Sequence, residues 1–231
     1  MKQKPTYIVA TIKPWNIKLF HGLISKYPGR WILVTDPKKL TPEFVLKLKP
    51  RYIFFPHWSW IVPKEILDAA ECVCFHEAAV PYGRGGSPIQ NLIVRGHKHT
   101  KISALRMEEG LDTGPVYMQR PLSLQGSAQE IFERAAPIVA GMIKTIAERN
   151  PKPKKQTGKV TVFKRRTPNM SDITQLAEPT IENIYDHIRM LDADTYPHAF
   201  IDLPKYRIEF TNARKKNGTI QADSVIIKKS L

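Results

Sequence analysis

Four short apolar runs alternate with stretches of helical spacing in the first third of the chain. Each run has the length of a strand and is rich in β-branched or aromatic residues. Continuous apolar runs of this kind are typical of strands that are buried on both faces of a parallel sheet. This order of strands and helices predicts the α/β class, with a mostly parallel central sheet covered by helices. The predicted strands are residues 7–12, 31–35, 52–55 and 73–75.

The helices predicted between these strands include residues 42–48 and 64–70. Thr41 is a suitable N-cap for the first of them, because a proline follows it at the first helical position. No G-x-G-x-x-G motif follows the first strand, so the fold is predicted to be Rossmann-like without an NAD site. Ligands of open α/β sheets bind beyond the carboxyl ends of the strands, and His76 directly follows the fourth predicted strand.

A long helix over residues 127–150 is predicted to end the main domain. Ser127 and Glu130 have the spacing of a capping box, and a linker rich in proline and lysine follows at residues 151–158. The predicted domains are therefore residues 1–150 and a small α+β extension, residues 151–231. The remaining predicted elements are helices 87–95 and 182–191, strands 101–107, 116–122 and 159–164, and a hairpin of strands 207–211 and 219–222 turned through Asn217 and Gly218.

The formal net charge of +15 is the most unusual bulk property of the chain. It fits nucleic acid, a polyanionic small molecule or a solvated basic surface equally well, so it does not select a substrate. No run approaches the roughly 18 apolar residues of a membrane span, and no signal peptide is recognisable, so a cytoplasmic protein without membrane contact is expected. Cys72, Cys74 and His76 lie on or directly beside one predicted strand, which cannot close a tetrahedral site, and no second cysteine or histidine cluster follows, so no metal is expected.

His76 and Asp112 are the residues whose surroundings most favour chemistry. His76 leaves an apolar strand for a loop rich in glycine and arginine, and a histidine held in this way can move protons near neutral pH. Asp112 lies between two glycines in the turn of residues 110–115 and could orient or charge-balance the imidazole. Either residue alone also fits an ordinary packed or turn position, but their joint occurrence favours an active site.

The two segments resemble the pattern of the folate-dependent formyltransferases, which move a formyl group from 10-formyltetrahydrofolate to an amine. The resemblance extends over nearly the whole chain. The matching residues are His76, Pro81, Arg84, Gly85, Pro88, Asp112 and Gly114. At one position the chain departs from the family, because Cys74 stands where the family has asparagine. A thiol is a weak hydrogen-bond donor, so either protonated His76 or a backbone N–H of the Gly85-Gly86 loop replaces the amide, or the activity is weak.

The resemblance implies His76, Asp112 and Cys74 as catalytic residues and 10-formyltetrahydrofolate as co-substrate. The pterin is expected between residues 56–63 and the turn of residues 110–115, held largely by backbone groups. The tryptophans of the first segment could instead belong to the core, and Arg84 could be structural. The cofactor-binding residues implied are Trp58, Trp60, Ile61, Arg84, Gly85, Gly86, Leu111 and Thr113.

The acceptor amine is predicted to belong to a nucleotide-linked amino sugar. The methionyl-tRNA enzymes of the family carry a C-terminal barrel of about 100 residues, more than follow the linker here. The sequence looks closest to the sugar N-formyltransferases of bacterial surface-sugar pathways, including the pseudaminic acid type. Arginine forks suit diphosphate and aromatic rings stack on bases. The predicted substrate-binding residues are Tyr82, Arg165, Arg166, Arg189 and Tyr196.

The predicted partners are therefore small molecules, and nucleic acid is not expected. Self-association as a homodimer is left open. Three alternatives remain at this point. The chain could be a formyltransferase of the methionyl-tRNA type or of the glycinamide ribonucleotide type, or it could be a catalytically weak homologue that only binds folate or a nucleotide sugar.

Overall fold

The computed structural model describes residues 4–177 and 179–229 of the chain. These residues form two compact units that are interleaved in sequence. The first unit comprises Met1–Arg84, Lys101–Leu122 and Glu133–Val162, and the second comprises Gly85–Thr100, Ser123–Phe132 and Phe163–Leu231. The chain thus passes between the units several times, and residues 85–100 and 123–132 group with the C-terminal residues.

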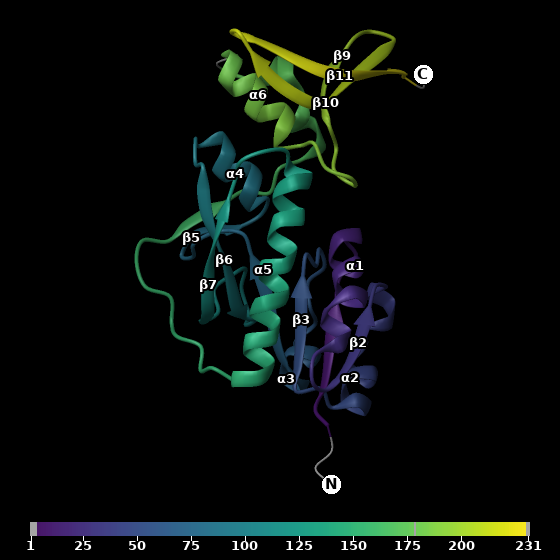
Figure 1. The fold of residues 1–231 in the computed structure, drawn as a ribbon, viewed down its shortest axis with the longest axis vertical. Helices are drawn as coiled ribbons and strands as arrows, with labels where there is room; N and C mark the ends of the chain where they lie inside the picture. The colour runs from purple at the N-terminus through teal and green to yellow at the C-terminus, as the bar shows by residue number, and fades with distance from the viewer. Residues whose placement is uncertain (1–3, 178, 230–231) are drawn as a thin grey trace. The chain divides into compact units, whose positions relative to one another are not determined.

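A six-stranded sheet in the order β2-β1-β3-β4-β6-β7 organises the first unit (Figure 1). The first four strands along this sheet pair in parallel, and β6 pairs antiparallel with β4. The prediction of a mostly parallel α/β sheet is confirmed. The strands are β1 (Thr6–Ala10), β2 (Arg30–Val34), β3 (Tyr52–Pro56), β4 (Glu71–His76), β6 (His99–Arg106) and β7 (Val116–Ser123).

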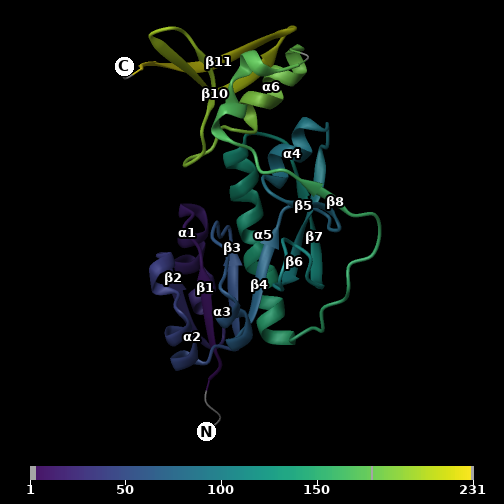
Figure 2. The same ribbon diagram turned by 180° about the vertical axis from the view of Figure 1, so that it is seen from behind.

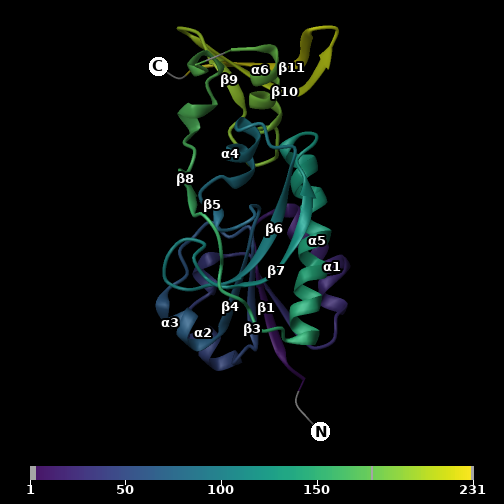
Figure 3. The same cartoon turned by 90° about the vertical axis from the view of Figure 1, so that its left-hand side faces the viewer.

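Helices cover both faces of this sheet (Figure 3). On one face lie α1 (Pro14–Gly22) and α5 (Ala128–Arg149), and on the other lie α2 (Pro42–Leu48) and α3 (Lys64–Ala69). The apolar strands require this double cover, because successive side chains of a strand point to opposite faces. On the α2 and α3 face, Ile8 of β1 lies beside Ile53 of β3, and both belong to one buried cluster with Val45 and Ile66.

Local sequence signals set the ends of the main helices as predicted. Thr41 caps α2 by accepting a hydrogen bond from the backbone N–H of Phe44 at 3.2 Å. The capping box of α5 is also present, since the N–H of Glu130 donates to Ser127 Oγ at 3.2 Å and the N–H of Ser127 donates to Glu130 Oε2 at 2.7 Å. These contacts satisfy N–H groups that have no partner within the helix.

The second unit contains a three-stranded antiparallel sheet in the order β11-β10-β9. Asn217 and Gly218 both have positive φ at the turn between β10 and β11, as the predicted Asn-Gly hairpin requires. The sequence did not predict β9 or β5, which pairs with β8 in a two-stranded sheet (Figure 2). The elements are α4 (Pro88–Val94), α6 (Ile181–Arg189), β5 (Tyr82–Gly85), β8 (Thr161–Phe163), β9 (Ala199–Asp202), β10 (Tyr206–Lys216) and β11 (Thr219–Lys228).

None of the helices described in residues 4–177 and 179–229 is long and apolar enough to cross a membrane. Within the same residues, no three histidine, cysteine, aspartate or glutamate side chains gather in a way that could hold a metal ion.

Candidate active site

His76 is the last residue of β4 and is held at both ring nitrogens. Its side chain is buried, with Nε2 2.6 Å from the carbonyl oxygen of Gly83 and Nδ1 3.5 Å from Oδ2 of Asp112. A carbonyl oxygen only accepts, so Nε2 must carry a proton that it donates to Gly83. Nδ1 then faces the carboxylate, and a protonated ring forms an ion pair there. The structure therefore brings together the two residues that the sequence singled out.

The turn that carries Asp112 has a backbone that few residues tolerate. Asp112 itself is in the left-handed region with φ of 54°, and Gly110 has φ of 100°. At Gly114 an added Cβ would lie 1.8 Å from the carbonyl oxygen of Arg106, so no side chain fits at that position. The tight approach of this turn to β6 places the aspartate opposite the histidine.

Arg84 and Gln156 connect this turn to the loop that follows His76. The Arg84 guanidinium donates from Nε and Nη2 to Oε1 of Gln156 at 3.1 and 2.9 Å. In turn, Nε2 of Gln156 donates to the carbonyl oxygens of Asp112 and Gly114 at 2.8 and 2.7 Å. Sequence reasoning missed Gln156, because a single glutamine within a stretch rich in proline and lysine carries no recognisable signal.

Cys74 lies two residues before His76 on β4, and so on the same face of the sheet. Burial raises the pKa of its thiol, and the negative charge of Asp112 raises that pKa further. The group is therefore a neutral thiol at pH 7, which is a poor donor to an oxyanion. The departure from the family asparagine thus persists as a chemical difference beside His76.

A second pair of histidine and carboxylate lies at the same edge of the sheet. His57 directly follows β3, and its Nε2 is 3.5 Å from Oε1 of Glu77, the residue after His76. Burial raises the pKa of Glu77 to about 7, and the charge of Asp112 contributes in the same direction. Burial lowers the pKa of His57 to about 3, and nearby Lys13 adds to this effect. Neither residue of this pair was predicted from the sequence.

The residues expected to line a pterin slot differ in how far they are buried. Trp58 is half-buried and packs edge-on against Phe55 and against Trp60, with ring centroids 5.8 and 5.1 Å apart. Ile61 is 91% exposed and Leu111 is 73% exposed. Thr113 Oγ1 donates to the carbonyl oxygen of Glu109 within its own turn. Exposed apolar side chains on these two segments are compatible with ligand contact, which stays a prediction.

The other predicted binding residues fall into the second unit, apart from Tyr82, which is half-buried on β5 in the first. Gly85 is the last residue of β5 and has φ of 97°. At Gly86 an added Cβ would lie 2.5 Å from Cα of Arg165, so the glycine permits close approach of that backbone. Arg165 is exposed. The guanidinium of Arg166 donates to the carbonyl oxygen of Met170.

Two of the predicted substrate-binding residues have structural positions instead. Arg189 is 5% exposed, and its Nη1 donates to the carbonyl oxygens of Leu124 and Gly126 at 2.7 and 2.8 Å. Its Nε pairs with Asp186 at 2.7 Å. The ring of Tyr196 stacks on that of Phe132, with centroids 5.2 Å apart. The fork of Arg189 is thus used within the fold, and a role in diphosphate binding is not supported.

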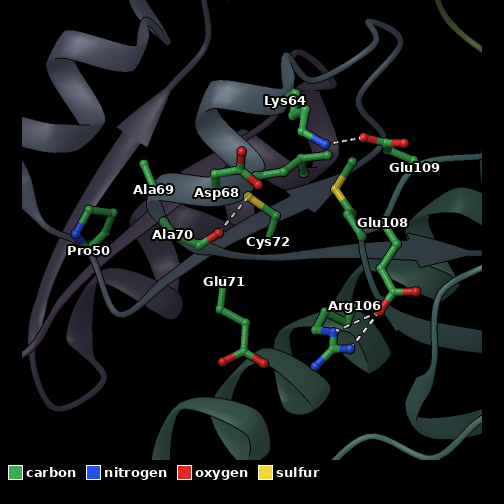
Figure 4. Close-up of a pocket in the computed structure, with 12 residues that line it drawn as sticks. Pro50, Lys64, Asp68, Ala69, Ala70, Glu71, Cys72, Arg106, Glu108 and Glu109 are labelled. Carbon is green, nitrogen blue, oxygen red and sulfur yellow. Dashed lines mark hydrogen bonds and ion pairs between the residues drawn. The ribbon is translucent and has the colours of Figure 1, made fainter.

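An open pocket in the first unit lies away from His76 (Figure 4). Glu71, which begins β4, lines it, whereas His76 ends that strand. Its charged side chains mostly pair with one another, as Lys64 does with Glu109 and Arg106 with Glu108. Among the described residues that line this pocket, none was predicted as a site residue, so it is a separate feature from the candidate active site.

Comparison with known proteins shows which protein family the chain belongs to. The family model "Formyl transferase" matches residues 37–133, and the model "Methionyl-tRNA formyltransferase, C-terminal domain" matches residues 168–227. A solved member of the family is 48% identical to this chain and is matched along 100% of its own length. The chain therefore belongs to the formyltransferase family, and the predicted enzyme class is confirmed.

That solved structure is methionyl-tRNA formyltransferase from Clostridium thermocellum, which covers 97% of this chain with a TM-score of 0.91. Methionyl-tRNA formyltransferase from Campylobacter curvus is 31% identical over 161 residues, which is 68% of this chain. The chain spans about half the length of this curated relative, 52% of it. HypX from Aquifex aeolicus, solved in complex with tetrahydrofolic acid, shares the fold at 15% identity and a TM-score of 0.67.

These findings correct the predicted substrate. The prediction of a sugar N-formyltransferase is wrong, because the C-terminal family model and the relatives at 31% and 48% identity all belong to methionyl-tRNA formyltransferases. A sugar N-formyltransferase from Shewanella shares only the fold, at 13% identity and a TM-score of 0.66. The prediction was wrong because it relied on the length of the C-terminal part of the chain. Residues 168–227 match this C-terminal domain although they are fewer residues than were expected for the barrel. Without a sugar substrate, the prediction that nucleic acid is not a partner also loses its basis.

Proposed function

We propose that this protein transfers the formyl group of 10-formyltetrahydrofolate to the α-amino group of methionyl-tRNA. The match of residues 168–227 to the C-terminal domain of methionyl-tRNA formyltransferase carries this proposal. It is joined by the likeness to the Clostridium thermocellum enzyme over nearly the whole chain. The formyl acceptor is then a primary amine at the end of a large polyanion.

The proposed chemistry uses His76 and Asp112 at the carboxyl edge of the sheet. The neutral amine attacks the formyl carbon, a C–N bond forms, and the former carbonyl oxygen becomes an oxyanion. The Asp112 carboxylate takes up the proton that the amine nitrogen loses, and protonated His76 stabilises the oxyanion. The bond from the formyl carbon to N10 of the folate then breaks, and the proton passes to that nitrogen. Cys74 contributes little donation in this scheme.

The contacts that hold the side chains of His76 and Asp112 in place support this proposed mechanism. Nδ1 of His76 lies 3.5 Å from Oδ2 of Asp112, and Nε2 is tied to the carbonyl oxygen of Gly83. A ring held in this way has a fixed orientation next to a carboxylate, which is the arrangement that proton transfer near an oxyanion needs. Reaction groups held in place before binding avoid the entropic cost of ordering them during the reaction.

The net charge of +15 agrees with a tRNA partner. Lysine and arginine side chains that neutralise phosphates release counterions, so the affinity of such a protein for nucleic acid falls steeply with salt. The C-terminal residues that match the family model include several of these side chains on β10, such as Arg214, Lys215 and Lys216. The proposal therefore predicts a marked dependence of methionyl-tRNA binding on ionic strength.

The direct test is an assay with purified protein, 10-formyltetrahydrofolate and methionyl-tRNA, following tetrahydrofolate release and formyl-methionyl-tRNA. We expect turnover, and we expect the affinity for methionyl-tRNA to fall at least roughly 10-fold between 50 and 200 mM salt. Free methionine serves as the control acceptor, since it has the same amine without the polyanion. Absence of turnover with methionyl-tRNA, with folate still bound, would reject the proposed function.

A further inference from the structure

The segment between α5 and β8 runs along the β7 edge of the sheet in the first unit (Figure 2). Two backbone hydrogen bonds tie it to β7, because the N–H of Val116 donates to Lys154 and the N–H of Lys154 donates to Val116, at 2.7 and 2.9 Å. Further along, the N–H of Thr161 donates to the carbonyl oxygen of Pro81 at 3.1 Å. The segment is therefore attached to the start of β7, just after the turn of Asp112, and to the loop that follows His76.

Gln156 is the residue of this segment that reaches the catalytic turn. Its amide nitrogen donates to the carbonyl oxygens of Asp112 and Gly114, at 2.8 and 2.7 Å, and its amide oxygen accepts two hydrogen bonds from Arg84. One half-buried side chain thus makes four hydrogen bonds, two with Arg84 on β5 and two with the turn that carries Asp112.

The Arg84 guanidinium determines which way the Gln156 amide points. Arginine offers only donors, so it requires the amide oxygen of Gln156 on its side. The NH₂ group must then face the opposite side, where it meets two carbonyl oxygens that can only accept. Every partner is matched in this arrangement, and a reversed amide would oppose donor to donor and acceptor to acceptor.

The hydrogen bonds of Gln156 reach the turn in which Asp112 has an unfavourable backbone conformation. Asp112 has φ of 54°, and this left-handed conformation is unfavourable for a residue other than glycine. A hydrogen bond to its own carbonyl oxygen, together with one to that of Gly114, holds the peptide planes that follow Asp112 and Gly114. This fixes the direction in which the Asp112 side chain leaves the backbone toward His76.

We infer that Gln156 is a positioning residue for the transfer reaction, acting by holding the turn of Asp112 against His76 through an amide that Arg84 orients. This inference rests on the proposed function for its catalytic consequence. A displacement of about 1 Å in a reacting group can cost about 100-fold in rate, so a released turn should lower kcat without weakening the binding of methionyl-tRNA.

Two substitutions separate the parts of this contact. Gln156→Glu keeps an acceptor for Arg84 but replaces the amide donor with a second oxygen facing the carbonyls of the turn. Gln156→Met keeps the length of the side chain and removes both the donor and the acceptor without adding charge. We expect both variants to lower kcat on the order of 10- to 100-fold with the KM for methionyl-tRNA nearly unchanged.

Hydrogen exchange of a peptide covering residues 108–116 provides a readout that does not depend on activity. In both variants the amides of this turn should exchange faster than in the wild type. Tyr117→Phe is the matched control, since it removes a partly buried hydrogen bond to Glu71 in the same unit, away from His76. It should lower the melting temperature while leaving kcat and the exchange of the turn unchanged.

The outcomes distinguish the inference from the proposed function. Unchanged exchange of residues 108–116 in both variants, or faster exchange with wild-type kcat, would overturn the role of Gln156. Loss of kcat in Tyr117→Phe comparable to that in the Gln156 variants would also overturn it, because general destabilisation would then explain the effect. If the wild type formylates no methionyl-tRNA, the proposed function fails, and the exchange data alone still decide whether Gln156 holds the turn.

Discussion

Two histidine–carboxylate pairs lie side by side at the carboxyl edge of the same sheet, and their geometry is nearly the same. His76 and Asp112 are separated by 3.5 Å, as are His57 and Glu77. The histidines end or follow neighbouring parallel strands, β4 and β3, so their positions in the sheet are equivalent. Distance alone therefore does not tell which of the two pairs performs chemistry.

The surroundings of the pairs differ. His76 is anchored on the carbonyl oxygen of Gly83, and Asp112 is carried by a turn that Gln156 holds from outside. In the other pair, burial dominates, because it raises the pKa of Glu77 to about 7 and lowers that of His57 to about 3. The first pair is thus held by hydrogen bonds to its neighbours, whereas burial disfavours the charged form of both residues of the second pair. We assign catalysis to the first pair and a structural role to the second.

The largest effect expected is on the first pair. His76→Asn should lower kcat for formylation of methionyl-tRNA by at least roughly 100-fold, because the variant cannot exchange protons or carry charge at this position. Steady-state rates with both substrates at saturation measure the change. His57→Asn is the matched control, and we expect it to retain most of the wild-type kcat. Equal losses in the two variants would remove the distinction between the pairs.

A smaller effect of opposite sign is expected at Cys74. Cys74→Asn places the family's amide donor two residues before His76, next to Asp112, where the neutral thiol donates poorly. A well-placed donor to an oxyanion is worth on the order of 100-fold in rate, so an increase of roughly 10-fold in kcat is a modest expectation. The same assay measures it, with Cys72→Asn as a control on the other cysteine. A slower Cys74→Asn enzyme would mean that the site has adapted around the thiol.

The smallest effects concern stability, and they test the second pair. Between about pH 4.5 and 6.5 the folded pair and the unfolded chain hold the same number of protons. In this range folded Glu77 is protonated and folded His57 is not. In the unfolded chain, where the pKa values are 4.5 for the glutamate and 6.5 for the histidine, the histidine holds the proton instead. The pH dependences of their two contributions to the free energy of unfolding therefore cancel in this range in the wild type.

Single substitutions should reveal the two slopes. In Glu77→Gln only His57 titrates, so stability should rise with pH between about 3 and 6.5, by about 1.4 kcal/mol per pH unit at most. In His57→Gln only Glu77 titrates, so stability should fall as the pH rises from about 4.5 to 7. Urea unfolding across this range measures both. If neither variant differs from the wild type in slope, then the pair is not buried in neutral form.

Most of the first unit could be predicted from the sequence. The strands read from apolar runs lie within one or two residues of β1 to β4, and α2 and α5 have the caps that Thr41 and the Ser127–Glu130 box indicated. These signals are local, because strand periodicity and helix capping depend on residues only a few positions apart. The four-residue strands β5 and β9 were not predicted.

The candidate site was predicted only in part. His76 and Asp112 were recognised from their loops, whereas Arg189 was assigned to substrate because arginine forks bind phosphates. In the fold that fork donates to the carbonyls of Leu124 and Gly126. A sequence does not show whether an arginine meets solvent or backbone. The substrate prediction is wrong for a related reason, because the number of residues after the linker does not show which C-terminal domain they form.

The sequence by itself thus determined the parallel sheet, the helix caps and the two residues at the centre of the candidate site. The tertiary structure decided which neighbours those residues have: Gln156, distant in sequence from Asp112, holds its turn, and His57 finds Glu77 rather than a ligand. The physical reason is that hydrogen bonds and burial depend on distances in space, whereas periodicity and capping depend on distances along the chain.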